Sequence, residues 1–396
     1  MKIAIVSWES LAGPAWTEAA VLASRSAETL AACGADVHLF TARGPQQPAE
    51  AMVGAVPCHR CAHDPSPDPR EEVESFGRAV LDRLGEEERQ ETFDFVHGFE
   101  WPAAAVLGEL RREGRRATAW SLLRFDEEWL PPKWLRDDPE VELRPRYHPE
   151  EFADRVLVPS DQAREWFLER WTVPPERVEV IHPGIDPLWL GETVDPAAVK
   201  AGLGFDVYDP VVLCIGPLTP AARPDLVLDA MPQVLERHQA AKLVFAGAGE
   251  LAGYLRERAL VLGVEGAARL PGEVCARELA QLCQACDVVC LPQRSRHLLA
   301  PYLESWSAGK PVVITGSHAA ADFVWHEVTG YVVEDSCEGI ARGILWLFED
   351  FARCRWIGEN GRRAVESAFG WPAIGGQLLD CYERTTAERA LSARPD

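Results

Sequence analysis

The stretch that decides the fold runs from Val288 to Thr315 and reads VVCLPQRSRHLLAPYLESWSAGKPVVIT. It opens with an apolar run, Val288 to Pro292, and closes with another, Pro311 to Thr315. Short apolar runs bounded by Pro and Gly are typical of strands that are buried on both faces. The residues between them predict a helix over Tyr302 to Ala308. The stretch therefore predicts a strand, a helix and a second, parallel strand.

The same alternation continues on both sides of this stretch. In the second half we expect further strands at 210–215, 242–246 and 268–270, and helices at 222–238, 251–262 and 276–286. In the first half we expect strands at 3–7, 36–41, 93–98, 117–123 and 153–160, and helices at 18–33, 102–113 and 162–171. Apolar strands that alternate with helices indicate parallel sheets covered on both faces.

Two intervals in the first half lack this pattern. Residues 46–69 are rich in Pro and small residues, and we interpret them as an irregular excursion. Residues 124–149 hold many Pro, Trp and charged residues, and we interpret them as a long loop or lid. A chain of 396 residues exceeds one typical core. The sequence therefore predicts an α/β protein with two doubly wound, Rossmann-like domains that face each other across a cleft.

Charge and hydropathy restrict the function classes. Forty Lys and Arg stand against sixty-two Asp and Glu, a formal net charge of −22, so the averaged surface repels phosphate backbones. We therefore expect no nucleic-acid partner. No stretch reaches the roughly 18 uninterrupted apolar residues that a membrane span needs. Residues 1–7 resemble a first strand and lack the features of a signal peptide, so we predict a cytoplasmic protein.

The eleven cysteines are odd in number and lie mostly in apolar segments, which favours reduced, buried thiols. Two groups have spacing that could suit a metal, Cys58 to His63 and the set Cys283, Cys286 and Cys290. The Cys58 to His63 group has no further pair of Cys or His at the spacing found in zinc fingers. Cys283, Cys286 and Cys290 follow the buried stripe of a helix that runs into a strand. We therefore expect a strand and a helix here, with no metal and no cofactor.

Four segments resemble family 4 of the glycosyltransferases, in the order that the family has them. They are Phe93 to Trp101, Ala153 to Ser160, Val173 to Asp186, and Phe369-Gly370-Trp371 with the helix that follows. The resemblance covers essentially the whole chain and implies the two-domain GT-B fold. It implies an N-terminal domain at 1–182, a C-terminal domain at 183–372, and a closing helix at 373–396 that packs back on the first domain.

The stretch quoted first resembles the donor-sugar site of this family. There, one Glu precedes a loop whose amides face a diphosphate, and a second Glu precedes Ala-x-Gly-x-Pro-Val-Val. Glu304 matches the second Glu, which binds the ribose of the nucleotide, whereas Arg296 replaces the first. Amides near Leu299 and Ala300 would cradle the diphosphate. Glu304 has an alternative role as a helix-start carboxylate that interacts with the helix dipole.

Other donor-side positions of the family are partly retained. Gly13 stands where the family has paired glycines, and Gly216 opens the loop whose two cations neutralise the leaving diphosphate. In that loop Arg223 comes one residue late, so it is either a phosphate ligand or a solvated cation at a helix start. Asp322 keeps a carboxylate in the last loop, or begins a helix there.

Four more positions complete the candidate site. Gly247 and Gly249 follow an apolar strand and fit the loop that borders the nucleobase. On the acceptor side, His97 and Glu100 lie at the end of a first-domain strand, where a doubly wound fold binds its ligand. The commoner outcome for a lone histidine such as His97 is a hydrogen-bonded core residue. We assign catalytic roles to Arg296, Glu100 and His97 as expectations.

Three functions compete. The first is a retaining glycosyltransferase that moves a sugar from a nucleotide-sugar to a glycan or small-molecule acceptor, without a metal. The second is a catalytically inactive GT-B homologue that acts as a binding or scaffolding subunit, since several family positions are altered. The third is an enzyme for a more anionic sugar that pairs with Arg296. Tryptophans around 120–134 would stack on sugar rings or form an interface with a protein partner or a second copy.

Overall fold

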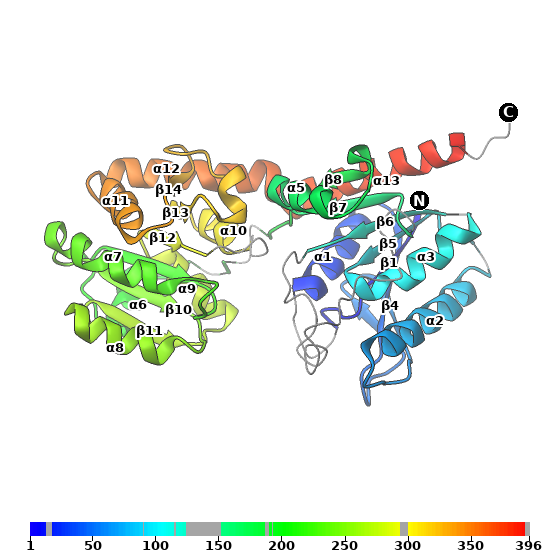
Figure 1. Cartoon of the computed structure of the whole chain (residues 1–396), viewed down its shortest axis with the longest axis horizontal. Coiled ribbons are helices and arrows are strands. Elements are labelled where there is room, and N and C mark those ends of the chain that lie inside the picture. The colour runs from blue at the N-terminus through cyan, green and yellow to red at the C-terminus, as the bar shows by residue number, and fades with distance from the viewer. Residues whose placement is uncertain are drawn as a thin grey trace. The chain divides into compact units, whose positions relative to one another are not determined.

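The computed structural model describes residues 1–12, 18–89, 91–114, 116–123, 152–186, 190–191, 193–293 and 300–392. The chain divides into two compact units (Figure 1). Unit 1 comprises Met1–Gly184 and Trp371–Asp396, and unit 2 comprises Ile185–Gly370. The predicted domain limits lie two residues from these. None of the described helices is long and apolar enough to cross a membrane.

Unit 1 contains an eight-stranded sheet in the order β3-β4-β2-β1-β5-β6-β7-β8. Its strands are β1 (Lys2–Val6), β2 (Asp36–Ala42), β3 (Glu50–Val53), β4 (Val56–Cys61), β5 (Phe95–Phe99), β6 (Ala117–Ser121), β7 (Arg155–Val158) and β8 (Val178–Val180). All neighbours pair in parallel except β3, which is antiparallel to β4. The chain builds outward from β1 in one direction and then restarts at β5, so the order reverses between these two strands.

Helices cover both faces of this sheet. They are α1 (Glu18–Ala32), α2 (Pro69–Glu87), α3 (Ala104–Glu113), α5 (Asp161–Arg170) and α13 (Trp371–Ser392), with 3-10 turns η1 (Trp101–Ala103) and η3 (Pro175–Arg177). One buried cluster joins α2, α3 and α5 to one face, and another joins α1 and α13 to the other. The C-terminal helix therefore completes the N-terminal unit, as predicted.

The interpretation of residues 46–69 as an irregular excursion is wrong. This interval contains the β3–β4 hairpin, and β4 pairs in parallel with β2, Leu39 lying opposite Cys58. Cys58 and Cys61 are buried thiols in that strand, as expected, and burial raises the pKa of Cys61 to about 12. The apolar pattern of β4 is short and interrupted by Pro57, so it becomes a strand by pairing with β2.

Unit 2 contains a six-stranded sheet in the order β11-β10-β9-β12-β13-β14, with every pair parallel. Its strands are β9 (Val211–Ile215), β10 (Lys242–Ala246), β11 (Ala268–Gly272), β12 (Val288–Leu291), β13 (Val312–Thr315) and β14 (Gly330–Val333). The order reverses between β9 and β12. In doubly wound sheets, ligands bind outside the carboxyl ends of the strands at such a point.

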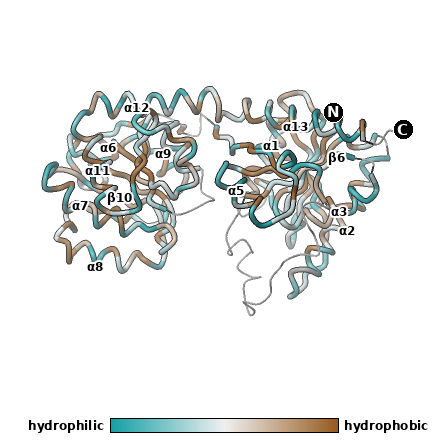
Figure 2. The backbone as a smooth tube through the Cα atoms, turned by 45° about the horizontal axis from the view of Figure 1, so that its top comes forward, coloured by the Kyte–Doolittle hydropathy of each residue, from teal (hydrophilic) through white to brown (hydrophobic). Residues whose placement is uncertain are grey.

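Two helical layers enclose this second sheet. They are built from α6 (Pro196–Gly202), α7 (Pro224–Arg237), α8 (Ala252–Leu262), α9 (Ala276–Ala285), α10 (Ala300–Ser307), α11 (Cys337–Phe348) and α12 (Phe351–Ala364), with 3-10 turn η4 (Ala319–Asp322) and a π-helical turn (Val365–Phe369). One buried cluster holds α7, α8 and α11, and another holds α9 and α10. Figure 2 shows hydrophobic colour in the strands, notably β10, and alternating hydrophilic and hydrophobic colour along the helices that cover the sheet. The predicted α/β class is confirmed.

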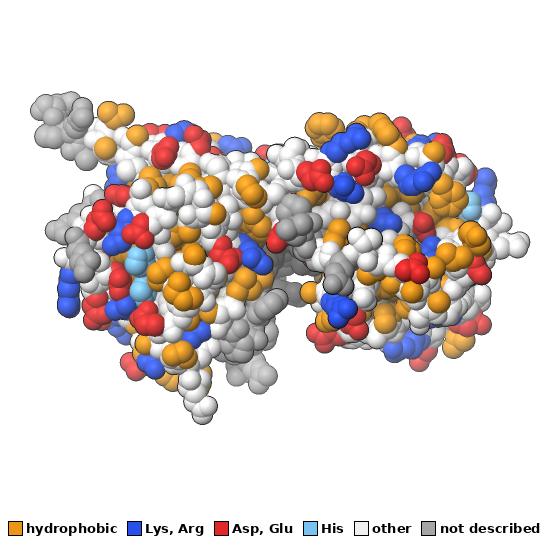
Figure 3. All heavy atoms as spheres, turned by 180° about the vertical axis from the view of Figure 1, so that it is seen from behind, with side chains coloured by type: hydrophobic (Ala, Val, Ile, Leu, Met, Phe, Trp, Pro, Cys, Tyr) orange, Lys and Arg blue, Asp and Glu red, His pale blue; other side chains and the backbone are white. Residues whose placement is uncertain are grey.

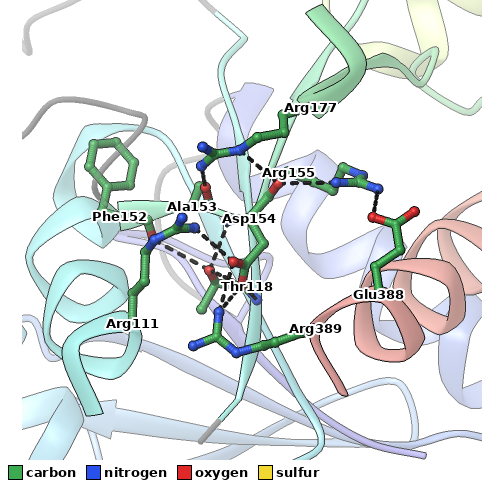
Figure 4. Close-up of polar contacts among 9 residues, drawn as sticks. All are labelled: Arg111, Thr118, Phe152, Ala153, Asp154, Arg155, Arg177, Glu388 and Arg389. Carbon is green, nitrogen blue, oxygen red and sulfur yellow. Dashed lines mark hydrogen bonds and ion pairs between the residues drawn. The ribbon is translucent and has the colours of Figure 1, made fainter. Parts of the chain in front are cut away.

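Asp154 connects α13 to the rest of unit 1 through hydrogen bonds and ion pairs (Figure 4). Its carboxylate accepts hydrogen bonds from Arg111 at 2.7 Å and from Arg389 of α13 at 2.7 and 2.8 Å. The Thr118 amide and hydroxyl donate to the same carboxylate at 2.9 and 3.1 Å. One partly buried carboxylate therefore joins the start of β6, helix α3 and helix α13.

Replacing Asp154 with Asn should lower the free energy of unfolding by about 3 kcal/mol, because Arg111 and Arg389 would lose their shared counter-charge. Urea denaturation followed by circular dichroism measures this loss. Asp380→Asn is the matched control on the same helix, since its pair with Arg384 is exposed and should contribute less than about 1 kcal/mol. Equal losses in the two variants would contradict the role of Asp154.

Candidate functional site

Loops from three strands meet at the point where the order of the second sheet reverses. Gly216 follows β9 with a φ of 134°, and a Cβ atom there would lie 3.1 Å from the Gln293 side-chain oxygen. Gln293 follows β12, is buried, and lies 3.5 Å from His318, Nε2 to Nε2. His318 comes from the loop after β13. The carboxyl ends of β9, β12 and β13 thus converge at one edge of the sheet.

His318 is held in one protonation state and one tautomer. Its Nδ1 accepts the Ala320 amide hydrogen at 2.9 Å, so the single ring proton of the neutral form lies on Nε2. Burial lowers the pKa of His318 to about 4, which keeps the ring neutral near pH 7. His318 and Gln293 were not predicted as site residues. Both are polar residues that follow an apolar strand, and this signal would have identified them.

The glycines of the predicted nucleobase loop serve a packing need. A Cβ at Gly247 would lie 1.9 Å from the Gly216 carbonyl oxygen, and one at Gly249 would lie 2.4 Å from the Leu218 carbonyl oxygen. The Leu218 amide donates to the Ala248 carbonyl at 2.9 Å. The loops after β9 and β10 are therefore in backbone contact, which only glycine permits at these two positions.

Glu304 is the most distinctive ionisable group of this unit. It lies in the second turn of α10, the helix that follows β12, so the alternative of a helix-start carboxylate does not apply. Its side chain is half-buried, and it has no hydrogen-bond or ion-pair partner among the described residues. Desolvation by burial raises its pKa from 4.5 to about 7. A half-buried carboxylate with a raised pKa marks a candidate ligand site.

Arg223 is engaged by the protein itself. It lies immediately before α7 with a φ of 52°, and its guanidinium donates to the Asp335 carboxylate at 2.8 Å and to the Asp335 carbonyl at 3.1 Å. Ser317 donates to the same carboxylate at 2.7 Å. The alternative of a solvated cation therefore does not hold, and a phosphate would have to compete with Asp335. Asp322 is the last residue of η4 and does not begin a helix.

Gly13, Arg296 and Leu299 lie outside the described residues, as does the predicted lid at 124–149. Ala300 is the first residue of α10, so its amide lies at the N-terminus of that helix.

His97 of unit 1 is a fully buried residue of β5. Its Nδ1 lies 2.6 Å from the Tyr382 hydroxyl and its Nε2 lies 2.8 Å from the Ser121 hydroxyl. Burial lowers its pKa to about 3, so the ring is neutral. It borders a cavity of about 30 Å³, which is too small for a sugar. This is the arrangement of a hydrogen-bonded core histidine, the alternative stated above.

Glu100 follows β5 in a strained backbone conformation, with φ 58° and ψ −174°. A residue other than glycine rarely adopts this region, and such strain concentrates at functional sites. Its carboxylate accepts the Leu123 amide hydrogen at 3.0 Å, and its carbonyl accepts the Trp120 indole hydrogen at 2.7 Å. Glu100 thus holds the carboxyl end of β6 next to that of β5, at the edge where the sequence predicts acceptor contacts.

Comparison with known families supports the architecture of both units. The model described as "Glycosyltransferase Family 4" matches residues 19–188, and the model described as "Glycosyl transferases group 1" matches residues 197–364. The two matches follow the division of the chain into unit 1 and unit 2.

Individual proteins agree with this result. An uncharacterised glycosyltransferase of Methanocaldococcus jannaschii is 28% identical over 233 residues, 58% of this chain and 60% of the relative. The D-inositol 3-phosphate glycosyltransferase of Kineococcus radiotolerans is 28% identical over 264 residues, 62% of this chain and 60% of the relative. The chain thus spans about 60% of the length of these curated relatives.

A solved structure shares the fold. The crystal structure of HepE from Anabaena in complex with UDP and glucose matches with a TM-score of 0.72, covering 97% of this chain and 100% of HepE at 19% identity. The two family matches and this likeness in fold point to the same classification. The chain belongs to the family 4 glycosyltransferases and has the GT-B fold.

Proposed function

We propose that this protein is a retaining glycosyltransferase that binds a nucleotide-sugar through unit 2 and transfers the sugar to a hydroxyl acceptor. The observation that carries the proposal is Glu304, a half-buried carboxylate without a polar partner among the described residues. A half-buried, desolvated carboxylate is costly unless a ligand supplies donors, and the two hydroxyls of a ribose would do so.

The surroundings of Glu304 support the same assignment. The sheet order of unit 2 reverses between β9 and β12, and α10 follows β12 directly. Gly216, Gln293 and the neutral His318 lie at that edge and offer polar groups of fixed orientation. The relatives agree in class, since one is a D-inositol 3-phosphate glycosyltransferase and HepE was solved with UDP and glucose.

The proposed reaction breaks the bond between the anomeric carbon and the phosphate oxygen. The electron pair leaves with the nucleoside diphosphate, and an acceptor oxygen forms the new bond and loses its proton to the phosphate or to water. Stabilising the charge on the leaving group is the main electrostatic demand. In this proposal Arg223 and Arg296 supply positive charge, Arg223 by leaving Asp335, and no metal takes part.

Calorimetric titration of the full chain with UDP-, GDP- and ADP-sugars tests donor binding. Transfer is then measured with the best donor and with D-inositol 3-phosphate as the first acceptor, suggested by the relative. We expect one donor to bind and the product to keep the anomeric configuration, as read by proton NMR. Activity should persist in a chelator, because no metal takes part.

The outcomes separate the alternatives. Donor binding without transfer to this acceptor or to mixed glycan acceptors would favour the inactive, scaffolding homologue. A clear preference for a uronic-acid donor would favour an enzyme for anionic sugars. Absence of binding to every nucleotide and nucleotide-sugar would refute the proposed function.

A further inference from the structure

A cluster of metal-ligand type lies in unit 1, apart from the positions discussed above. It consists of His38 of β2, His59 of β4 and Glu87 at the end of α2, whose ligand atoms all lie within 4.8 Å of one another. His38 Nδ1 is 2.9 Å from His59 Nε2 and 3.9 Å from a Glu87 carboxylate oxygen. Three segments far apart in the sequence thus place two imidazoles and one carboxylate around a common point.

Both histidines have a carboxylate on the ring nitrogen that faces away from this point. The Glu50 carboxylate lies 2.8 Å from His59 Nδ1, and the Asp36 carboxylate lies 3.5 Å from His38 Nε2. A neutral imidazole carries one ring proton, and a carboxylate on the outer nitrogen would accept that proton once a cation occupies the inner nitrogens. In the ion-free chain an Arg83 guanidinium nitrogen also lies 3.0 Å from His59 Nδ1 and competes with Glu50 for it. In the same ion-free chain the 2.9 Å contact between His38 Nδ1 and His59 Nε2 is a hydrogen bond, so one of the two inner nitrogens carries a proton that a bound cation would displace.

We propose that His38, His59 and Glu87 bind a divalent transition metal, with zinc as the best fit. Two imidazoles and one carboxylate form a ligand set that zinc accepts, and magnesium disfavours imidazole. The two histidine side chains are 14% and 5% exposed, whereas Glu87 is 24% exposed, so the ion would lie near the surface with room for a water ligand. Figure 3 shows one face of the molecule, on which acidic and basic side chains are interspersed.

Arg83 would compete with a metal ion for the carboxylates of this site. One of its guanidinium nitrogens lies 2.5 Å from Glu87 and 3.2 Å from Glu50, so it neutralises the carboxylates that would serve the metal. Its Nε is buried and has no hydrogen-bond partner among the described residues. Binding of the ion would displace this guanidinium from Glu87. A metal site therefore predicts that removal of Arg83 strengthens binding, whereas a purely structural network gives no such prediction.

The ion would join β2, β4 and α2. The hairpin that contains β4 packs at the edge of the unit 1 sheet, where β3 and β4 are the outermost strands. A metal bridge from β4 to α2 would stabilise that edge. This inference does not depend on the proposed transfer reaction, in which no metal takes part.

Calorimetry with zinc chloride tests the site, using the full chain without a histidine tag and after treatment with a chelator. We expect one ion per chain and a rise in melting temperature. His38→Gln should abolish binding, and Glu50→Gln should weaken it about 10- to 100-fold by releasing the His59 ring. His326→Gln is the matched control, an exposed histidine of unit 2 that lies 3.7 Å from Glu327 and should have no effect.

Arg83→Gln provides the second readout, which remains informative if the His38 variant folds poorly. We expect it to bind zinc more tightly than the natural chain. Failure of zinc to bind the natural chain and the Arg83 variant would overturn the proposal. Binding that survives both His38→Gln and Glu87→Gln would overturn it equally, because the ion would then lie elsewhere.

Discussion

Replacing Glu304 with Gln is expected to weaken binding of the nucleotide-sugar by about 10- to 100-fold. In the proposed function, its carboxylate accepts two hydrogen bonds from the ribose, and a hydrogen bond to a charged group contributes about 1.5–3 kcal/mol. Glutamine keeps the shape of the side chain but loses the charge and one acceptor oxygen. Transfer should fall at least in proportion, since the donor must be bound for the reaction to occur.

Calorimetric titration of the natural chain and the variant with the preferred donor measures this effect. Glu257→Gln on α8 is the control, because it makes the same chemical change at an exposed position of the same unit. Unchanged donor affinity in the Glu304 variant would remove this residue from the donor site. Equal loss in both variants would indicate a general effect of charge.

The second large effect concerns stability, and it has the opposite sign. The folded state holds the pKa of Glu304 at about 7 because of burial, against 4.5 when the carboxyl is solvated. Between these two pH values the folded chain binds more protons than the unfolded chain, so its stability falls as the pH rises. The full cost is reached above pH 7 and amounts to about 3 kcal/mol.

The uncharged Glu304→Gln variant avoids that cost. It should therefore be more stable than the natural chain by up to about 3 kcal/mol at pH 8 and equal to it near pH 4. Urea denaturation of the ligand-free proteins at both pH values measures the difference. A gain of the same size at pH 4, or no gain at pH 8, would show that the desolvated charge is not its cause.

The two expectations concern the same side chain, whose charge strengthens donor binding and lowers the stability of the ligand-free protein. Hydrogen bonds donated by a ligand would offset the cost of this half-buried carboxylate, which explains why a destabilising residue occupies the position. Donor affinity should accordingly rise as the pH passes upward through about 7, because the charged form of Glu304 is the better acceptor.

Residue patterns predicted those parts of the fold that depend on local order. The apolar strands β9, β10, β12 and β13 alternate with helices at short intervals, and each was predicted to within about two residues. A strand was expected at Cys58 to His63, where β4 lies, but β3 and the hairpin that joins the two strands were missed because both strands are short. Pairing between distant segments has no signature in a local window.

The candidate site shows the same division. Glu304 was predicted from the sequence around it, but its lack of a polar partner depends on burial by the surrounding elements. Arg223 was expected to meet a phosphate or solvent, and the structure pairs it with Asp335, more than one hundred residues away along the chain. His97 lay at the expected strand end, yet its two hydroxyl partners come from β6 and α13.

The sequence by itself determined the α/β class, the two-unit organisation and the family, because strand and helix periodicity and ordered motifs are properties of adjacent residues. Only the tertiary structure decided which polar groups are paired, buried or free to bind. The His38, His59 and Glu87 cluster exists only where β2, β4 and α2 pack together. Hydrogen bonds, desolvation and metal geometry depend on distances in space, and folding sets those distances.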